Sequence, residues 1–255
     1  MKHPYAVLAA AAVVLAATLP ARAQPAEVKR VVRTFDFEER RLGNVEDLPM
    51  HWSKVQGAGY PHYVNGKLAT DLAHAGQYSF RLDLNGGSVA YRYAAGRIRV
   101  MSGAHYRIEA AVRTSVMPSA RARVTAYLVD VDGRPLPKTV RHTTPYAAAS
   151  PDEGWRTVAL ELSADDPAAA SLVLEVALLQ PALYAEQSLG RRTLNAQDIQ
   201  GTAWFDDITV SQVPRVVMTT DRPANVFRRG EPVRLAVRVD DRSTDDLAAQ
   251  IVVAD

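Results

Sequence analysis

The stretch GTAWFDDITV, residues 201–210, alternates apolar residues with threonine and aspartate. This alternation is typical of a β-strand that buries one face. If Ile208 and Val210 point inward, the period of two places Trp204 and Asp206 on the same side. A carboxylate turned toward a core is costly when it has no partner, so we expect Asp206 to be paired, capped by backbone N–H groups or bound to a metal ion.

The same alternation recurs along most of the chain. It is found in residues 78–84, 105–114, 121–130, 155–162 and 172–179. An Asn-Gly-Gly sequence at 85–87 separates two strand patterns and predicts a hairpin. No long stretch has a helical period, and we expect at most a short helix within 180–201. Strands of this length separated by turn residues predict an all-β fold, an antiparallel jelly-roll sandwich.

The N-terminus has the layout of a secretory signal peptide. A basic start at Lys2 and His3 precedes an apolar run at 6–19, and small residues follow at 21–23. The run is shorter than the roughly 20 apolar residues that a membrane span needs. We therefore expect residues 1–23 to be a signal peptide, residues 24–30 a linker, and the protein to be secreted, periplasmic or extracellular in a bacterium.

Charge and cysteine content exclude other classes. The chain has 30 basic and 28 acidic side chains and no cysteine. Loss of Lys2 and Arg22 with the signal peptide leaves equal numbers of basic and acidic side chains. A formal charge of zero gives no general reason to expect a nucleic-acid partner. An exported chain without cysteine has no disulfides, so its stability must come from the core and from any bound ion.

Several motifs in 31–212 resemble, in order and spacing, the galactose-binding-like jelly roll of carbohydrate-binding modules of the family four and nine group. The matching pieces are FDFEE (35–39), HAGQYSFRLDL (74–84), VMSGAHYRIEAAVRT (100–114), GWRTVALEL (154–162) and GTAWFDDITV (201–210). The resemblance implies a carbohydrate-binding module whose partner is a polysaccharide or another glycan.

The resemblance also implies a structural calcium ion. In that family, calcium often joins the first strand to the last through a carboxylate after the opening FE and through an aspartate of the closing DD. Carried over to this sequence, the ligands are Glu38 and Asp206, and backbone carbonyls complete the shell. The alternatives for Asp206 are pairing with an arginine or capping by backbone N–H groups.

Sugar recognition requires aromatic faces beside planar polar groups. The candidates are Trp52, Tyr60, Tyr63, Tyr127, Tyr146 and Tyr184. Trp52 has a structural alternative, because it can close one end of the sandwich. Parity places Tyr127 with Arg121 and Arg123 on a solvent-facing side, where its alternative is packing against an arginine stem.

The residues present give little support for catalysis. There is no cysteine nucleophile, no Gly-x-Ser-x-Gly sequence and no metal-type spacing of histidines. A boundary near 212–216 precedes further strand pattern, and 213–255 is too short for an immunoglobulin-like sandwich of about 100 residues.

We therefore expect an incomplete immunoglobulin-like domain at 213–255, with downstream domains of the same polypeptide beyond it. The interpretation is a non-catalytic accessory module of a glycoside hydrolase or another polysaccharide-active enzyme. One alternative is a structural or adhesive surface protein built from tandem β-domains without sugar affinity. In another alternative, the jelly roll only packs against a catalytic domain that follows it.

Overall fold

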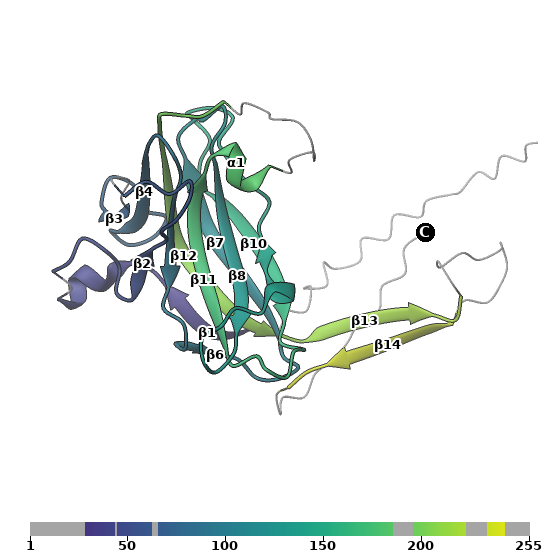
Figure 1. Ribbon diagram of the computed structural model, residues 1–255. Coiled ribbons are helices and arrows are strands. Elements are labelled where there is room, and N and C mark those ends of the chain that lie inside the picture. Colours follow the sequence, from purple (N-terminus) through teal and green to yellow (C-terminus); the bar gives the residue numbers. More distant parts are fainter. Residues whose placement is uncertain (1–28, 44, 63–65, 186–195, 223–233, 243–255) are drawn as a thin grey trace, which may run out of the picture.

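Two antiparallel β-sheets pack face to face, and a separate two-stranded sheet follows them (Figure 1). The computed structural model describes residues 29–43, 45–62, 66–185, 196–222 and 234–242. The predicted signal peptide at 1–23 and the candidate Tyr63 lie outside these residues. The predicted all-β class and the antiparallel sandwich are confirmed.

Sheet A has β12 at its centre. Its strand order is β10 (Arg156–Ser163), β7 (His105–Thr114), β12 (Gln200–Val213), β4 (Ser79–Asn85) and β3 (Gly66–Ala69), and β1 (Arg30–Phe35) also pairs with β12. Every pairing is antiparallel. The motif that begins at Gly201 therefore forms the middle of a sheet.

Sheet B has β11 at its centre. Its strand order is β2 (Trp52–Lys54), β5 (Val89–Tyr93), β11 (Ser171–Leu179), β8 (Arg121–Val129) and β9 (Arg141–His142), and β6 (Ile98–Arg99) also pairs with β11. All nine residues of β11 are buried, so both faces of this strand are covered. One face meets the core, and other parts of the chain cover the opposite face.

Helical structure in the described residues is limited to three short segments. They are η1 (Glu38–Leu42), η2 (Pro137–Thr139) and α1 (Pro181–Tyr184). The helix α1 confirms the short helix expected within 180–201. Among the helices of the described part, none has the length and apolar character needed to cross a membrane.

The core lies between the inner faces of the two sheets, and the alternating stretches 78–84 and 121–130 contribute side chains to it. Phe80 and Leu82 in β4 are fully buried, as are Val124 and Leu128 in β8. Burial of such side chains contributes about 1.5–3 kcal/mol each. The alternation in these two strands therefore identifies their core-facing side chains.

The hairpin predicted at 85–87 is wrong. The strand before the turn, β4, belongs to sheet A, and the strand after it, β5, belongs to sheet B. Gly86 and Gly87 have φ values of 75° and 70°, which side-chain-bearing residues rarely adopt. The glycine pair lets the chain cross from one sheet to the other instead of folding back within a sheet.

The prediction that Trp204 points inward with Asp206 is also wrong. Phe205 and Asp206 are both fully buried, and the register of β12 shifts between Asp206 and Thr209. Asp207, within this bulge, has a φ of 44°. A bulge adds one residue and resets the alternation, so Trp204 faces outward on the other side of the strand.

The chain leaves the sandwich at Val213 and enters β13 (Arg215–Thr220), which pairs with β14 (Leu235–Asp240). Figure 1 shows this ribbon extending away from the two large sheets. The guanidinium of Arg30 donates to both carboxylate oxygens of Asp241 at 2.8 and 2.9 Å. The immunoglobulin-like character of 213–255 stays a prediction.

Candidate functional site

A row of polar side chains crosses the outer face of sheet B. Glu175 of β11 lies opposite Arg92 of β5 on one side and Thr125 of β8 on the other. Thr125 in turn lies opposite His142 of β9. Residues directly opposite in neighbouring strands point to the same face, so four strands each contribute one side chain. We call these four residues, together with Arg123 and Tyr127, the sheet B face.

Three contacts order this row. The Arg92 guanidinium donates to Glu175 Oε2 from Nη2 at 3.2 Å and from Nε at 3.3 Å. Thr125 Oγ1 and His142 Nδ1 are 2.9 Å apart. Arg92 Cζ also lies 5.7 Å from the centre of the Tyr127 ring, a cation–π distance. The row is therefore held in place by its own side chains.

Arg123 lies on the same face, opposite Ala177 of β11. Its side chain is half-buried, and its Nε is buried without a hydrogen-bond acceptor among the described residues. Burial lowers the pKa of the guanidinium, while the charges of Tyr60 and Glu175 act in the opposite direction. A buried N–H donor without an acceptor is unfavourable. Because this Nε is closed to solvent, a ligand oxygen would meet the exposed part of the half-buried guanidinium instead.

Apolar clusters flank the row on both sides, displaced from it along the strands. One consists of Ala90, Ala177 and Leu179 with Val55, Tyr60, Leu183 and Tyr184 packed on it. The other consists of Tyr127, Val129 and Val173 with Val140. The Tyr184 hydroxyl donates to the carbonyl of Ser119, which fixes the end of α1 over the first cluster. These clusters cover the ends of the outer face and leave the polar row between them.

The electrostatic environment leaves mostly neutral groups around the guanidinium ions. Burial and the neighbouring charge of Glu175 raise the pKa of Tyr60, and burial raises that of Tyr127. Burial and the nearby charge of Arg123 lower the pKa of His142. Neutral phenols and a neutral imidazole both donate and accept hydrogen bonds. The face therefore combines arginine donors, a carboxylate and neutral polar groups, a set that suits a ligand rich in hydroxyl groups.

The structure gathers three predicted ligand residues, Tyr60, Tyr127 and Tyr184, around this face. The expected exposure of Tyr127 is wrong: the residue is 8% exposed and packs beneath Arg92, the alternative considered from the sequence. Trp52 lies in the core, 6% exposed, with its ring centre 5.4 Å from that of Phe35. It therefore packs in the core of the sandwich, which favours a structural role over contact with a sugar.

Tyr146 lies apart from the sheet B face. It lines a pocket at the open edge of the sandwich, beside β10. Arg156 Cζ is 5.2 Å from the centre of its ring, and its hydroxyl donates to Glu153 Oε1 at 3.0 Å. The five predicted aromatic residues that the structure describes thus do not form one site.

The sequence analysis missed Arg92, Glu175 and His142. Glu175 had a detectable signal, because it is the single charged residue in the apolar run LVLEVALL at 172–179. An isolated charge in a buried strand requires a partner. Arg92 and His142 had no comparable signal, because only the cross-strand register brings them beside the carboxylate.

Glu38 and Asp206 both contact the segment 74–78. Asp206 Oδ2 accepts from the backbone N–H of His74 at 2.7 Å and of Ala75 at 3.3 Å, and Oδ1 accepts from the N–H of Asp207 at 2.8 Å. Glu38 Oε1 accepts from the N–H groups of residues 77 and 78 at 2.5 and 2.8 Å. Backbone capping, one alternative for Asp206, is thus present.

These two carboxylates fit calcium in the kind of donor they offer. Carboxylate oxygens have more than one lone pair, so an oxygen that accepts one N–H can also bind a cation. Burial raises the pKa of Asp206 to about 6 despite its three N–H donors, so its charge is incompletely compensated. Among the described residues, no group of three or more His, Cys, Asp or Glu side chains is placed around one metal position. Backbone carbonyls would have to supply the remaining ligands, and calcium stays a prediction.

No family model and no curated protein matches the sequence. Among solved structures, the chain is similar to the CBM22-1 xylan-binding domain of Paenibacillus barcinonensis Xyn10C, with 13% identity and a TM-score of 0.45 over 74% of this chain and 98% of that one. It is also similar to the CBM22-1–GH10 modules of Clostridium thermocellum Xyn10B, with 11% identity and a TM-score of 0.40 over 71% and 28%. The enzymatically active domain of tailspike protein 4 from bacteriophage CBA120 has 10% identity and a TM-score of 0.43 over 66% and 20%. At these identities the similarity concerns the fold alone.

Proposed function

We propose that the sheet B face binds a neutral polysaccharide and that the described chain does so without catalysis. The observation that carries this proposal is the cross-strand row of polar side chains on the outer face of sheet B, with the half-buried guanidinium of Arg123 beside it. A sugar hydroxyl would accept from this guanidinium, and other hydroxyls would meet Glu175 and His142. Tyr60 and Tyr184 would offer partly exposed rings to the pyranose C–H groups.

We further propose that the module is exported and serves a longer polysaccharide-active protein. The apolar run at 6–19 and the small residues after it support export. A glycoside hydrolase domain in the same polypeptide is the partner that suits a non-catalytic sugar-binding module. The alternative, a structural or adhesive surface protein, predicts no sugar affinity and is separated by the experiment below.

The test is affinity electrophoresis of the full chain in gels that contain plant or microbial polysaccharides, followed by calorimetry with the best ligand. We expect retardation by at least one neutral glycan and no release of reducing ends. Arg123→Gln should weaken binding at least about tenfold, as expected for loss of a charge-assisted hydrogen bond.

Arg97→Gln is the matched control, because Arg97 is exposed and outside the sheet B face. It should leave binding unchanged. Absence of retardation on a broad panel would favour the structural alternative. Equal weakening by the two substitutions would show that general charge, rather than the sheet B face, is responsible.

We also propose a structural calcium ion held by Glu38 and Asp206. The convergence of two carboxylates from opposite ends of the sandwich sequence on the segment 74–78 supports this proposal. Calcium would compensate the buried charge of Asp206 and would tie the segment after β1 to β12. Its role would be stability and not sugar recognition.

A further inference from the structure

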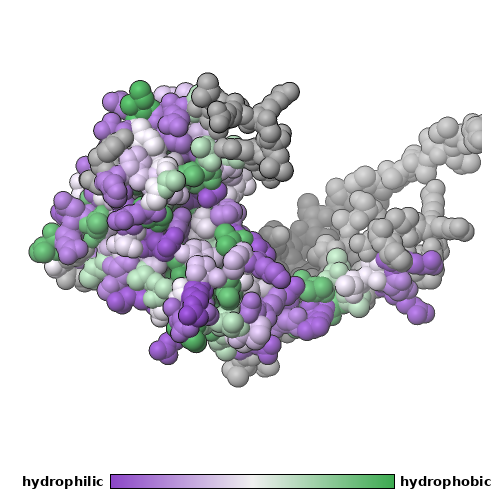
Figure 2. All heavy atoms as spheres, in the orientation of Figure 1, coloured by the Kyte–Doolittle hydropathy of each residue, from purple (hydrophilic) through white to green (hydrophobic). Residues whose placement is uncertain are grey.

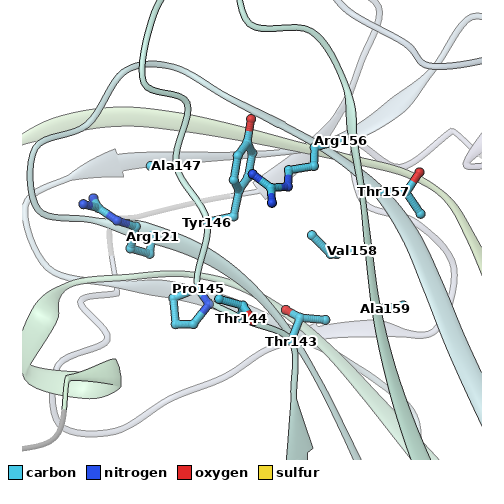
Figure 3. A pocket seen from close by; sticks show the side chains of 10 residues that line it. All are labelled: Arg121, Thr143, Thr144, Pro145, Tyr146, Ala147, Arg156, Thr157, Val158 and Ala159. Atoms are coloured by element: carbon cyan, nitrogen blue, oxygen red, sulfur yellow. The ribbon is translucent and has the colours of Figure 1, made fainter. Parts of the chain in front are cut away.

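A pocket of about 380 Å³ lies at the open edge of the sandwich, between β10 of sheet A and the segment that follows β9 of sheet B (Figure 3). Its polar lining consists of Arg121, Thr143, Thr144, Tyr146, Arg156 and Thr157. Among the described residues that line it, none carries a carboxylate. Figure 3 shows Arg121 and Arg156 on the two sides of Tyr146. The pocket is therefore positively charged and rich in hydroxyl groups.

Backbone pairing fixes one wall of this pocket. Tyr146 and Ala122 exchange backbone hydrogen bonds of 2.9 and 2.7 Å, and the Thr143 N–H donates to the Val124 carbonyl at 2.9 Å. Thr143 Oγ1 also accepts from the Val124 N–H at 3.0 Å. These bonds extend the edge of β8 beyond β9. A wall held by main-chain bonds keeps its side chains in place before a ligand arrives.

Hydrogen bonds to the main chain also hold the side chain of Arg121 in place. Its Nη1 donates to the carbonyls of Met117 and Ala120 at 2.9 and 2.7 Å, and its Nη2 donates to the carbonyl of Pro118 at 3.1 Å. These acceptors are uncharged, so the positive charge of Arg121 is not cancelled by a bonded carboxylate. Arg121 is therefore a fixed cation on one side of the pocket.

Arg156 supplies the second cation. It is exposed, stacks on the Tyr146 ring and has no hydrogen-bond acceptor within the described chain. Glu153 interacts with the charge of Arg156 but is not hydrogen-bonded to it, and it accepts from the Tyr146 hydroxyl at 3.0 Å and from the Ala149 N–H at 2.7 Å. The forked N–H groups of Arg156 are thus available to a planar anion, which is the geometry that arginine recognises best.

We infer that this edge pocket binds an acidic sugar residue, a uronate of a charged polysaccharide. The carboxylate would accept from Arg156 in the positive field of Arg121, and the ring hydroxyls would meet Thr144 and Thr157. The volume falls in the range typical of small-ligand pockets and exceeds what a bare inorganic anion fills. Arg156 covers the Tyr146 ring, which leaves no open aromatic face for a nucleic-acid base. This site is separate from the sheet B face and does not depend on its function.

The test is calorimetry of the full chain with α-1,4-linked trigalacturonate, and with the neutral galactose trisaccharide for comparison. We expect the acidic trisaccharide to bind and the neutral one to be at least about tenfold weaker at this pocket, because it lacks the charge-assisted bond. Arg156→Gln should weaken trigalacturonate at least about tenfold, and Arg156→Lys should restore part of the affinity. Backbone amide shifts on titration should concentrate in residues 143–147 and 156–159.

Arg123→Gln is the matched control from the sheet B face and should leave trigalacturonate binding unchanged. Because Arg156 is exposed, its substitution should not alter the melting temperature, which separates lost binding from lost folding. The inference is overturned if the wild-type chain does not bind trigalacturonate, if Arg156→Gln binds it equally well, or if Arg123→Gln removes the binding. Displacement of trigalacturonate by sodium acetate or sulfate, each at the concentration used for trigalacturonate, would also overturn the inference. It would show that the pocket binds any small anion.

Discussion

Asp206 and Glu175 are the two buried carboxylates of the described chain, one in the central strand of each sheet, and they are compensated in different ways. Glu175 accepts from the guanidinium of Arg92 on the outer face of sheet B. Asp206 accepts from three backbone N–H groups beside the bulge of β12. One buried charge thus meets another charge, while the other meets only peptide dipoles.

The two ways of compensating a buried carboxylate distinguish a surface that can bind a ligand from a buried position that serves stability. Around Glu175, charged and neutral polar side chains form a row that a ligand can contact, and Arg123 keeps an unsatisfied donor. Around Asp206, the main chain encloses the carboxylate, so a ligand larger than an ion has no access to it. Both carboxylates are only partly compensated. We therefore expect a sugar to bind beside Glu175, where the row is accessible, and a cation to bind Asp206, where only an ion has room. In the view of Figure 2, apolar residues are scattered over the surface of the sandwich, which favours polar recognition over a large apolar contact.

Removal of calcium is expected to have the largest effect. An ion that binds only the folded state stabilises it by about 2.7 kcal/mol at a hundredfold excess over Kd. Since each kcal/mol shifts the midpoint by roughly 2–4 °C in a domain of this size, chelation should lower the melting temperature by several degrees. Added calcium should restore it, and Asp206→Asn should abolish the response. If the melting curve of the metal-free protein does not respond to added calcium, the proposed calcium site is wrong.

The pH dependence of the chelated protein sharpens this test. Burial raises the pKa of Asp206 from 3.8 to about 6, so between these values the folded state binds more protons than the unfolded state. The free energy of unfolding should therefore fall as the pH rises from about 4 to about 6, by at most about 3 kcal/mol, and then level off. Urea titrations at several pH values measure this slope. Saturating calcium should flatten it because the ion stabilises the charged carboxylate, and Asp206→Asn should remove this contribution.

Glu175→Gln should have an intermediate effect. The substitution leaves Arg92 and the half-buried Arg123 without their counter-charge. Breaking a buried pair costs about 3–5 kcal/mol, but Arg92 is largely solvated, so we expect a loss of about 2 kcal/mol. Urea denaturation at pH 7 measures it, and sugar affinity should fall with it. The double variant with Arg92→Gln should lose less than the sum of the single losses, because the two residues are coupled. Strict additivity would contradict the pairing.

Local alternation in the sequence predicts which side chains of a regular strand are buried. It does not predict the features that depend on how strands pair and where a bulge shifts their register. Phe80, Leu82, Val124 and Leu128 are buried as expected, because each lies in an uninterrupted run with period two. Trp204 is placed on the wrong side because the bulge beyond Asp206 resets the period, and the FDD sequence gives no signal for it.

The choice of sheet and the assembly of the site are non-local. The turn at 85–87 has strong hairpin residues, yet β4 does not pair with β5. It pairs with β3, which precedes it, and with β12, more than a hundred residues later in the chain. Glu175 and Arg92 are 83 residues apart in sequence and become neighbours only through the pairing of β11 with β5. Candidate aromatic residues could therefore be identified singly, while the face that joins Tyr60, Tyr127 and Tyr184 could not.

The smallest effect is expected on the outer face of sheet A, where charges are paired in solvent. Glu161 accepts from Arg107 at 3.3 Å and lies 3.2 Å from His105, and its side chain is 47% exposed. Exposed pairs contribute about 0–1 kcal/mol, so Glu161→Gln should change the free energy of unfolding by less than about 0.5 kcal/mol and leave sugar binding intact. The change should shrink further in 0.5 M salt, which screens exposed charges.

Glu161→Gln is also the matched control for Glu175→Gln, because both remove one carboxylate that faces an arginine across neighbouring strands. They differ in burial: the side chain of Glu175 is 11% exposed. If the two substitutions cost the same, burial does not distinguish the faces, and the argument that sheet B carries an incompletely compensated recognition surface fails. A clear excess for Glu175 that shrinks less in salt than the loss at Glu161 would support the functional charge on sheet B, because burial of the Glu175 carboxylate weakens screening.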